Sequence, residues 1–500
     1  MLEKVTPEQV GISSKSVKKY IKILEKNEFS THSIVMLRHG KVFYEAYWEP
    51  FHKDFLHRIY SSTKSFVALA IGFLQQDGLI DLDAPAVSYL DDDITKNACD
   101  EVKKQTIRDM LIMSTAGMCT VAGFFKEKPE DRLRYYYDCA GPDSSVKPKL
   151  TGSTFLYDSS GSFVLGCIVE IITGMGLMDY LREKLFDKIG FSKEAYCLTC
   201  PGGHAWSDSG ILCRPMDLAK VMQFLLNEGE WNGEQILDKK FIKEATSNLV
   251  STKRAAHRDS GGTYGYGYLI WRTAGNGFAF MGLGNQLAIA FPDYDMVFVV
   301  TADNQTNPKT GEAVMIDRLL EEIAETAKNE ALDEDKEAYS DLMDFTNSLK
   351  LYSFSGSIEE NISKEISGKT FIMEENPMGI SKIKFTFTDD VCKMDYTNAQ
   401  SDKTIEFGIN KNVFGIFPQE GYSDLVGNTY APGNYYKCAA SAAWTHERNL
   451  EILVQVIDKY FGKLFIKVFF TEDGRIAVSM NKTAENFMNE YMGYAQSIAE

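Results

Sequence analysis

A serine and a lysine three positions apart form the first pair in this sequence that could carry out chemistry. Ser61 and Lys64 lie in the segment YSSTK, directly before the apolar stretch 66–74, which stops near Asp77-Gly78. This pattern predicts a helix that begins at the serine, so the two side chains share one face of its first turn. At that position, free N–H groups and the helix dipole favour the negative charge of acyl transfer. The neighbouring lysine can take the serine proton, or help another base to do so.

The S-x-x-K spacing alone is a weak signal. The chain holds at least five copies, the others beginning at Ser16, Ser144, Ser381 and Ser479. Only the copy at Ser61 opens a long apolar helix. The alternative interpretation is that this serine only caps the helix.

A tyrosine before a second helix strengthens the catalytic interpretation. Tyr157, Asp158 and Ser159 directly precede the apolar stretch 163–172, which ends at Gly174. A phenol near a lysine can relay protons to a leaving group. The alternatives are a packed aromatic ring at Tyr157 and a helix cap at Asp158 or Ser159.

Strand patterns occur on both sides of this helical part. Residues 15–24 have a helical pattern, and the strand-like runs 32–38 and 41–48 are separated by His39-Gly40, which predicts a hairpin. After the helix-rich part, a second β region returns at 264–272 and 277–302. We therefore expect an α/β (α+β) domain over residues 1–330. Its antiparallel sheet would be closed by distant segments and flanked by helices, with a helical subdomain beside it.

The remainder of the chain, residues 331–500, has a different pattern of residue types. Residues 331–349 are acidic and helix-prone, with the run DEDKE, and suggest a helical linker. Residues 350–500 alternate apolar and polar side chains in several segments, which predicts an all-β barrel-like or sandwich accessory domain. These segments are 382–387, 404–407, 450–456, 464–470 and 475–479.

Size and charge limit the possible partners. A chain of 500 residues exceeds one ordinary hydrophobic core. Its net charge of −17 argues against nucleic acid or an anionic membrane surface as the main partner, because both attract a basic face. The start of the chain lacks a signal-peptide pattern, and the apolar runs are too short to span a bilayer. We therefore expect a soluble, cytoplasmic protein.

The nine cysteines do not suggest a disulfide framework. Cys197 and Cys200 form a C-x-x-C, with only His204 close by, so reduced cysteines near a loop are favoured over a metal or redox site.

The two motifs together resemble the class C β-lactamase and penicillin-binding-protein-like family. That family includes DD-peptidases, D-amino-acid peptidases, carboxylesterases and nylon-oligomer hydrolases. S-x-T-K before an apolar helix, followed by Y-x-S before a second helix, carries the likeness. Segments 106–117, 208–218 and 264–271 are similar to the family in the same order. The resemblance implies a β-lactamase/transpeptidase-like fold.

The resemblance also implies roles for individual residues. Ser61 would be acylated, Lys64 and Tyr157 would share the general acid/base work, and Ser159 would contact the substrate or the lysine. The Ser61 N–H and an N–H at Gly282 or Leu283 would form the oxyanion hole. The substrate would be a small ester, amide or peptide, with no metal or organic cofactor. The acylation base and the oligomeric state stay open.

One stretch departs from the family pattern. Where β-lactamases and DD-peptidases carry K-T-G or H-T-G, this chain has Phe280-Met281-Gly282. Recognition of a β-lactam carboxylate is therefore in doubt, and an ester or uncharged amide fits an apolar wall better. Replacement cations, if they exist, would come from Arg254, His257, Arg258 or Arg272, although ordinary surface charge is the simpler interpretation.

The favoured function is thus a serine hydrolase that works through a Ser61 acyl-enzyme. Two alternatives remain. The protein is a penicillin-binding or sensor-like protein that acylates with little turnover, or its accessory domain is the functional part and binds a ligand or a second subunit.

Overall fold

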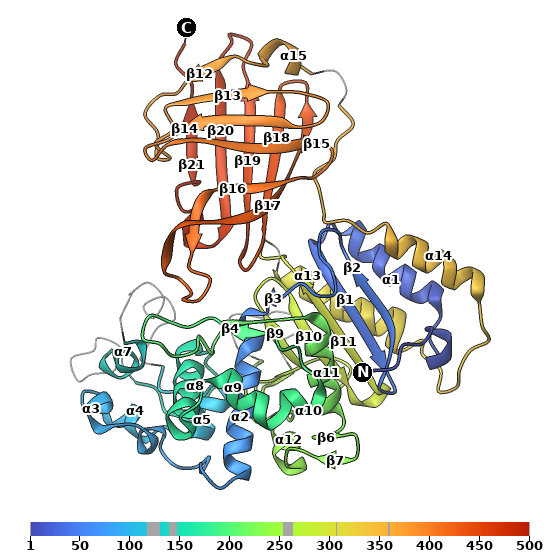
Figure 1. Ribbon diagram of the computed structural model, residues 1–500, viewed down its shortest axis with the longest axis vertical. Helices are drawn as coiled ribbons and strands as arrows, with labels where there is room; N and C mark the ends of the chain where they lie inside the picture. Colours follow the sequence, from blue (N-terminus) through green and yellow to red (C-terminus); the bar gives the residue numbers. More distant parts are fainter. Residues whose placement is uncertain are drawn as a thin grey trace. The chain divides into compact units, whose positions relative to one another are not determined.

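A computed structural model describes residues 2–117, 131–139, 148–253, 264–306, 308–358 and 361–499 (Figure 1). The chain divides into two compact units. The first comprises Met1–Lys350 together with Leu425–Gly427, and the second comprises Leu351–Asp424 and Asn428–Glu500. The first mixes helices with an antiparallel sheet and the second is built around a many-stranded sheet, which confirms the predicted fold class.

The first unit is built on a six-stranded antiparallel sheet in the order β2-β1-β11-β10-β9-β8. The N-terminal hairpin therefore pairs with strands from the far end of the domain, for example Ile34 with Val300. The strands are β1 Thr31–Arg38, β2 Lys41–Tyr47, β8 Trp271–Arg272, β9 Phe278–Gly282, β10 Gln286–Phe291 and β11 Met296–Ala302.

Every residue of β1, β10 and β11 is buried, so both faces of this sheet must be covered, and helices cover them. Helix α11 (Pro215–Leu226) packs on these three strands. Helix α1 (Ser14–Lys26) packs through Tyr20, whose ring meets Phe298 edge-on and whose hydroxyl donates to the Met315 carbonyl of α13 (Pro308–Leu319).

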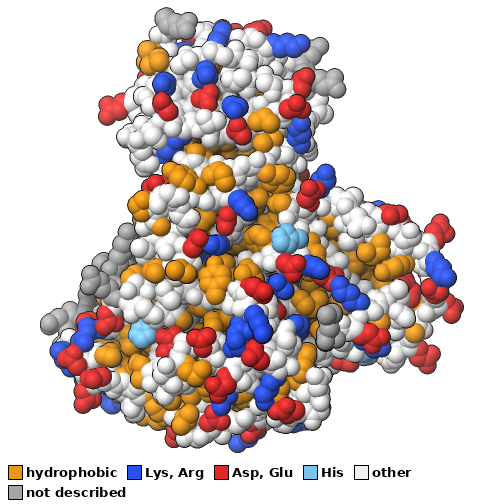
Figure 2. Space-filling view, viewed as in Figure 1, with side chains coloured by type: hydrophobic (Ala, Val, Ile, Leu, Met, Phe, Trp, Pro, Cys, Tyr) orange, Lys and Arg blue, Asp and Glu red, His pale blue; other side chains and the backbone are white. Residues whose placement is uncertain are grey.

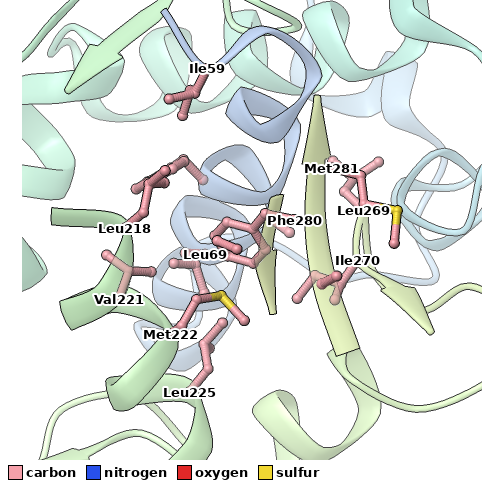
Figure 3. Close-up of a cluster of buried hydrophobic side chains, with 14 of the residues drawn as sticks. Ile59, Leu69, Leu218, Val221, Met222, Leu225, Leu269, Ile270, Phe280 and Met281 are labelled. Carbon is pink, nitrogen blue, oxygen red and sulfur yellow. The ribbon is translucent and has the colours of Figure 1, made fainter. Parts of the chain in front are cut away.

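Helix α2 (Thr63–Gln76) is the central helix, and its first twelve residues are all buried. A helix that is apolar all round must be enclosed on every side. It packs against α8 (Ser159–Thr173) and against the sheet, where Leu69 lies near Phe280 and Met222 (Figure 3).

Short helices and two small sheets complete this unit. The helices are α3 Asp92–Thr95, α4 Asp100–Lys104, α5 Ile107–Leu111, α7 Arg132–Asp138, α9 Leu177–Leu181, α10 Asp187–Ile189 and α12 Lys239–Ala245. The small sheets are formed by β3 His57–Arg58, β5 Ile211–Cys213 and β4 Tyr196–Cys197, and by β6 Glu230–Trp231 and β7 Glu234–Gln235.

The acidic stretch 331–349 belongs to the first unit. It contains α14 (Lys336–Asn347), which packs on α1 through an ion pair of 2.6 Å between Lys18 and Asp341. The Thr346 hydroxyl lies 2.9 Å from that of Tyr44 on β2.

The second unit is a sheet that closes on itself. Its strands run in the order β12-β13-β14-β15-β17-β18-β19-β20-β21, and β16 pairs with β17. The Glu374 N–H donates to the Gln496 carbonyl at 2.8 Å, and the Ile498 N–H to the Ile372 carbonyl at 2.9 Å, which joins the first and last strands. The strands are β12 Thr370–Ile372, β13 Lys382–Thr386, β14 Cys392–Thr397, β15 Asp402–Ile409, β16 Val413–Tyr422, β17 Tyr430–His446, β18 Asn449–Ile457, β19 Phe461–Phe470, β20 Ile476–Ala484 and β21 Gly493–Gln496, with the short helix α15 Ser363–Ile366 before them.

Acidic and basic side chains are interspersed on the face shown in Figure 2. Ion pairs are common among the described residues, for example between Lys4 and Glu45 at 2.6 Å and between Lys188 and Glu234 at 2.7 Å. No single helix among the described residues has the length and hydropathy to cross a membrane, and one pair bent by 72°, 159–173 with 177–189, meets those criteria only together.

The packing around α2 gives a stability prediction. Leu69→Ala removes a fully buried side chain, so we expect the first unit to lose about 2–5 kcal/mol of unfolding free energy. Leu79→Ala is the matched control, since that side chain is 51% exposed and the change should stay within about 0.5 kcal/mol. Urea unfolding followed by circular dichroism measures both. Equal midpoints for the two variants would contradict the packing described.

Candidate active site

The turn before α2 presents Ser61. Ser61 lies in a short 3-10 helix, Tyr60–Ser62, that runs directly into α2. Tyr60 has a φ of 46°, a left-handed conformation that few non-glycine residues adopt. Before it, the Ile59 N–H donates to the Ile211 carbonyl at 3.0 Å and anchors the turn to the strand β5. Ser61 is partly exposed, whereas Ser62 and the following residues of α2 are buried.

Lys64 lies directly beside Ser61. Its side chain is 1% exposed, and its Nζ donates to the Ser61 Oγ at 3.1 Å and to the Asp208 carbonyl at 2.8 Å. The same Nζ lies 5.2 Å from the centroid of the Tyr157 ring. The structure therefore brings Tyr157 beside Ser61 and Lys64, although more than ninety residues separate it from them in the sequence.

Tyr157 is held by an aromatic cluster. Its ring stacks on Trp271 of β8 with centroids 5.9 Å apart and planes inclined by 20°. Trp271 in turn meets Phe155 and Tyr266 edge-on, at 5.5 and 4.7 Å. This cluster joins the loop before α8 to the strands after the helical part, so the phenol has a defined position beside Lys64.

Ser159 is the first residue of α8 and is buried. The preceding Asp158 caps that helix, accepting from the Gly161 N–H at 3.0 Å and from the Thr115 hydroxyl at 2.7 Å. The helix cap is thus provided by Asp158, and the Ser159 hydroxyl is not needed for it.

The end of β9 lies against the turn that carries Ser61. A Cβ added at Gly282 would be 2.2 Å from the Ile59 carbonyl oxygen, so the strand approaches this closely only with glycine. Leu283 follows and is 48% exposed. The end of β9 therefore lies beside the turn that carries Ser61.

The two residues that replace the polar pair of the family belong to the core. Phe280 is fully buried, and its ring meets Phe66 edge-on at 5.6 Å. Met281 is 2% exposed and points to the other side of the strand, near Leu269 (Figure 3). Neither provides a charge to the site.

The candidate replacement cations are only partly described. Arg254, His257 and Arg258 lie outside the described residues. Arg272 donates to the carbonyls of Thr246 at 2.9 Å and Asn276 at 3.1 Å, and burial lowers the pKa of its guanidinium. Its hydrogen bonds therefore support two loops.

The histidine nearest to Ser61 in sequence is structural. His57 is buried, with Nε2 2.8 Å from the His32 Nδ1 and Nδ1 2.9 Å from the Arg58 carbonyl. Burial lowers the pKa of His57 to about 3, so the ring is neutral at physiological pH. His32 stacks on Phe51 at 3.9 Å. The pair supports the strand that leads into the nucleophile turn.

The C-x-x-C residues are free thiols. Burial raises the pKa of Cys197 and Cys200, which keeps both protonated and unreactive. His204 is hydrogen-bonded to Glu170 at 2.7 Å, and this bond raises the pKa of the imidazole. Within the described part of the chain, no group of three or more His, Cys, Asp or Glu residues could hold a metal ion.

Sequence reasoning missed the surroundings of Lys64. Asp208 lies in the segment similar to the family's glycine turn, but nothing in the sequence indicated that its carbonyl accepts from Lys64. Burial raises the pKa of the Asp208 carboxyl, and Lys64, Arg132 and Arg58 oppose that shift. Arg58 and Arg132 are also buried, and neither belongs to a motif that the sequence made recognisable.

Comparison with known proteins places this geometry in context. A family model described as Beta-lactamase matches residues 19–321, which is more than half of the chain. A 6-aminohexanoate-dimer hydrolase of Paenarthrobacter ureafaciens is 26% identical over 244 residues, covering 47% of this chain and 61% of the relative, so the chain matches less than two thirds of that protein.

Solved structures show the same fold. A Bacillus anthracis protein provisionally named as a 6-aminohexanoate-dimer hydrolase has a TM-score of 0.51 and 21% identity, covering 64% of this chain and 86% of its own. A Bacteroides dorei protein provisionally named as a beta-lactamase has a TM-score of 0.50 and 15% identity, covering 62% of this chain and 98% of its own.

The close approach of β9 predicts the effect of a single methyl group. Gly282→Ala would push the strand away from Ile59 and displace the turn that holds Ser61. A displacement of about 1 Å in a reacting group can slow a reaction about a hundredfold, which is the loss we expect in the rate of fluorophosphonate labelling. Gly415→Ala is the control, because its Cβ would meet nothing within 4 Å. An unchanged rate in folded Gly282→Ala would contradict the geometry.

Proposed function

Because this chain belongs to the beta-lactamase family, we propose that it is a serine hydrolase that cleaves an ester or amide bond through an acyl-enzyme on Ser61. The observation that carries the proposal is the 3.1 Å hydrogen bond from Lys64 Nζ to Ser61 Oγ, with Tyr157 beside the same amine. This is a nucleophile with a base in reach and a third group beside the base.

The reaction would proceed in two acyl transfers. The Ser61 Oγ attacks the carbonyl carbon, and its proton passes to Lys64 or Tyr157. The tetrahedral intermediate collapses, the bond to the leaving oxygen or nitrogen breaks, and the leaving group receives that proton. Water then attacks the acyl-enzyme by the same path, which releases the acid and restores the Ser61 hydroxyl.

The oxyanion of the intermediate would be stabilised by backbone donors. The Ser61 N–H lies at the start of α2, where the helix dipole favours negative charge. The second donor would come from the end of β9, at Gly282 or Leu283. Preorganised N–H donors of this kind contribute about 3–4 kcal/mol to transition-state stability. Ser159 would contact the substrate or the lysine from the start of α8.

The substrate class follows from the side chains on β9. Phe280 and Met281 are packed in the core, so this strand offers no cation to a substrate carboxylate. The wall nearest to Tyr157 is aromatic, made by Trp271, Phe155 and Tyr266. We therefore propose that the substrate is an ester or an uncharged amide that carries no carboxylate near the scissile bond.

A protein that acylates without turnover is the second candidate. The core packing of Phe280 and Met281 favours it, because it removes side chains that position substrates in related hydrolases. The two candidates differ only in deacylation, so turnover distinguishes them.

Ser61→Ala tests the nucleophile. We expect wild type to take up one fluorophosphonate adduct by intact mass and to hydrolyse p-nitrophenyl butyrate, and the variant to do neither. Ser62→Ala is the matched control, since it removes a neighbouring hydroxyl that is 1% exposed, and it should label like wild type.

Two other results are informative. Equal labelling of wild type and Ser61→Ala would mean that the S-x-x-K segment at Ser61 only caps a helix. An adduct on wild type without p-nitrophenyl butyrate turnover would favour the slowly deacylating protein.

A matched pair of esters tests the substrate class. Mono-p-nitrophenyl succinate and p-nitrophenyl butyrate share a leaving group, but only the succinate carries a carboxylate. A carboxylate that is buried without a hydrogen-bond partner costs about 1–3 kcal/mol in lost hydration, and β9 offers it no cation, so we expect kcat/KM to be about tenfold lower for the succinate. Equal or better use of the succinate would show that a cation faces the site.

A further inference from the structure

The turn that follows β9 has a buried amide on its inner side. Residues 283–285 connect β9 to β10, and the next residue, Gln286, is only 1% exposed although its side chain is polar. Gly284 and Asn285 have φ values of 80° and 67°, so the chain reverses direction through two left-handed residues. Burial of an amide is costly unless its hydrogen bonds are made, so the contacts of Gln286 show what it supports.

The Gln286 side chain makes three hydrogen bonds to the main chain. Its Nε2 donates to the Leu283 carbonyl at 2.9 Å and to the Ala302 carbonyl, and its Oε1 accepts from the Ala302 N–H at 3.2 Å. A glutamine amide has two N–H donors, and both are used here. The ladder between β10 and β11 ends at Leu287 and Val300, and these bonds continue it to Ala302. The amide therefore ties the turn after β9 to the end of β11.

The main-chain N–H of Leu283 thereby lies between two fixed points. On one side, Gly282 pairs with Gln286 in the strand ladder and lies so close to the Ile59 carbonyl that a Cβ would be 2.2 Å from it. On the other side, the Leu283 carbonyl accepts from Gln286 Nε2. Because peptide groups are planar, fixing the groups on both sides leaves this N–H little freedom to turn.

We propose that Gln286 is a positioning residue of the hydrolase, whose amide orients the main-chain N–H at the end of β9 toward the oxyanion formed on attack by Ser61. This inference rests on the proposed function and goes beyond it, because it assigns a role to a side chain that need not touch the substrate. The short 3-10 helix that carries Ser61 packs on both β9 and β10, so the nucleophile and this donor share one support. A donor held in place in advance stabilises the transition state without reorganisation.

The test uses the full chain and compares Gln286→Met with wild type. Methionine has nearly the same length and volume as glutamine but cannot donate to the two carbonyls. One oxyanion donor contributes roughly a hundredfold to a thousandfold in rate, and a displaced donor loses part of this. We therefore expect kcat/KM for p-nitrophenyl butyrate, measured per active site titrated with fluorophosphonate, to fall about tenfold to hundredfold.

Propyl trifluoromethyl ketone separates positioning from folding. This ketone carries the propyl group of the butyrate, and attack by a serine hydroxyl converts it into a tetrahedral adduct with a negatively charged oxygen. Its inhibition constant for Gln286→Met should rise by the same factor as kcat/KM falls, since both quantities depend on binding of the oxyanion. A role in folding alone would lower the number of titrated active sites and leave the inhibition constant unchanged.

Two further variants complete the comparison. Gln223→Met is the matched control, because Gln223 is 3% exposed and donates to the Asn227 side chain at the end of α11. It should keep the wild-type kcat/KM and inhibition constant, whatever its effect on stability. Gln286→Asn retains an amide that is one methylene shorter and leaves at least one of the two carbonyls without its donor. It should change both quantities in the same direction as Gln286→Met, by a smaller factor.

The outcomes separate this inference from the proposed function. Wild type without labelling or turnover would overturn the proposed function, and the inference with it. If wild type is labelled without turnover, the labelling rate takes the place of kcat/KM. An active wild type with an unchanged inhibition constant in folded Gln286→Met would overturn the inference alone, as would an equal rise in Gln223→Met. If Gln286→Met does not fold, Gln286→Asn decides, since a raised inhibition constant there supports the inference and a wild-type constant overturns it.

Discussion

The burial of a lysine amine beside a serine is the constraint on which the rest of this structure depends. Lys64 has almost no contact with solvent, and its N–H bonds have to be satisfied inside the protein. Ser61 Oγ accepts one and the Asp208 carbonyl accepts another, while the Tyr157 ring faces the same nitrogen. Each partner comes from a different element. The turn before α2, the turn before β5 and the loop before α8 must all be in place before this amine can be buried.

The second constraint is the close approach of two backbones. The nucleophile turn and the end of β9 meet where Gly282 lies against the Ile59 carbonyl, with no room for a side chain. The strand belongs to the sheet that pairs the first hairpin with the last strands of the domain. The end of β9 is thereby fixed by the core of the unit, and the position of Ser61 follows from the packing of α2 beneath it.

Local patterns in the sequence were sufficient to predict several of these helices and strands. The apolar run after Ser61 indicated α2, and the hairpin at His39-Gly40 formed as β1 and β2. The long strand β17 (Tyr430–His446) was missed, because its centre is AASAA and alanine has little preference for strands. Its pairing with β18 and β16 overrides that preference. The hydrogen bond from Lys64 to the Asp208 carbonyl was missed for a different reason, since contacts between residues 144 positions apart leave no periodic signal.

The separation of chemistry from recognition explains where this chain departs from its family. The proposed acyl transfer would require Ser61, a proton carrier and backbone donors, and none of these depends on the side chains of β9. Phe280 could therefore be taken into the core beside Phe66 without disturbing the turn that carries Ser61. A strand whose side chains are used for packing offers no charge with which to select a substrate. Under the proposed function, selection would fall to the groups around Tyr157, and in the described residues these include the rings of Trp271, Phe155 and Tyr266.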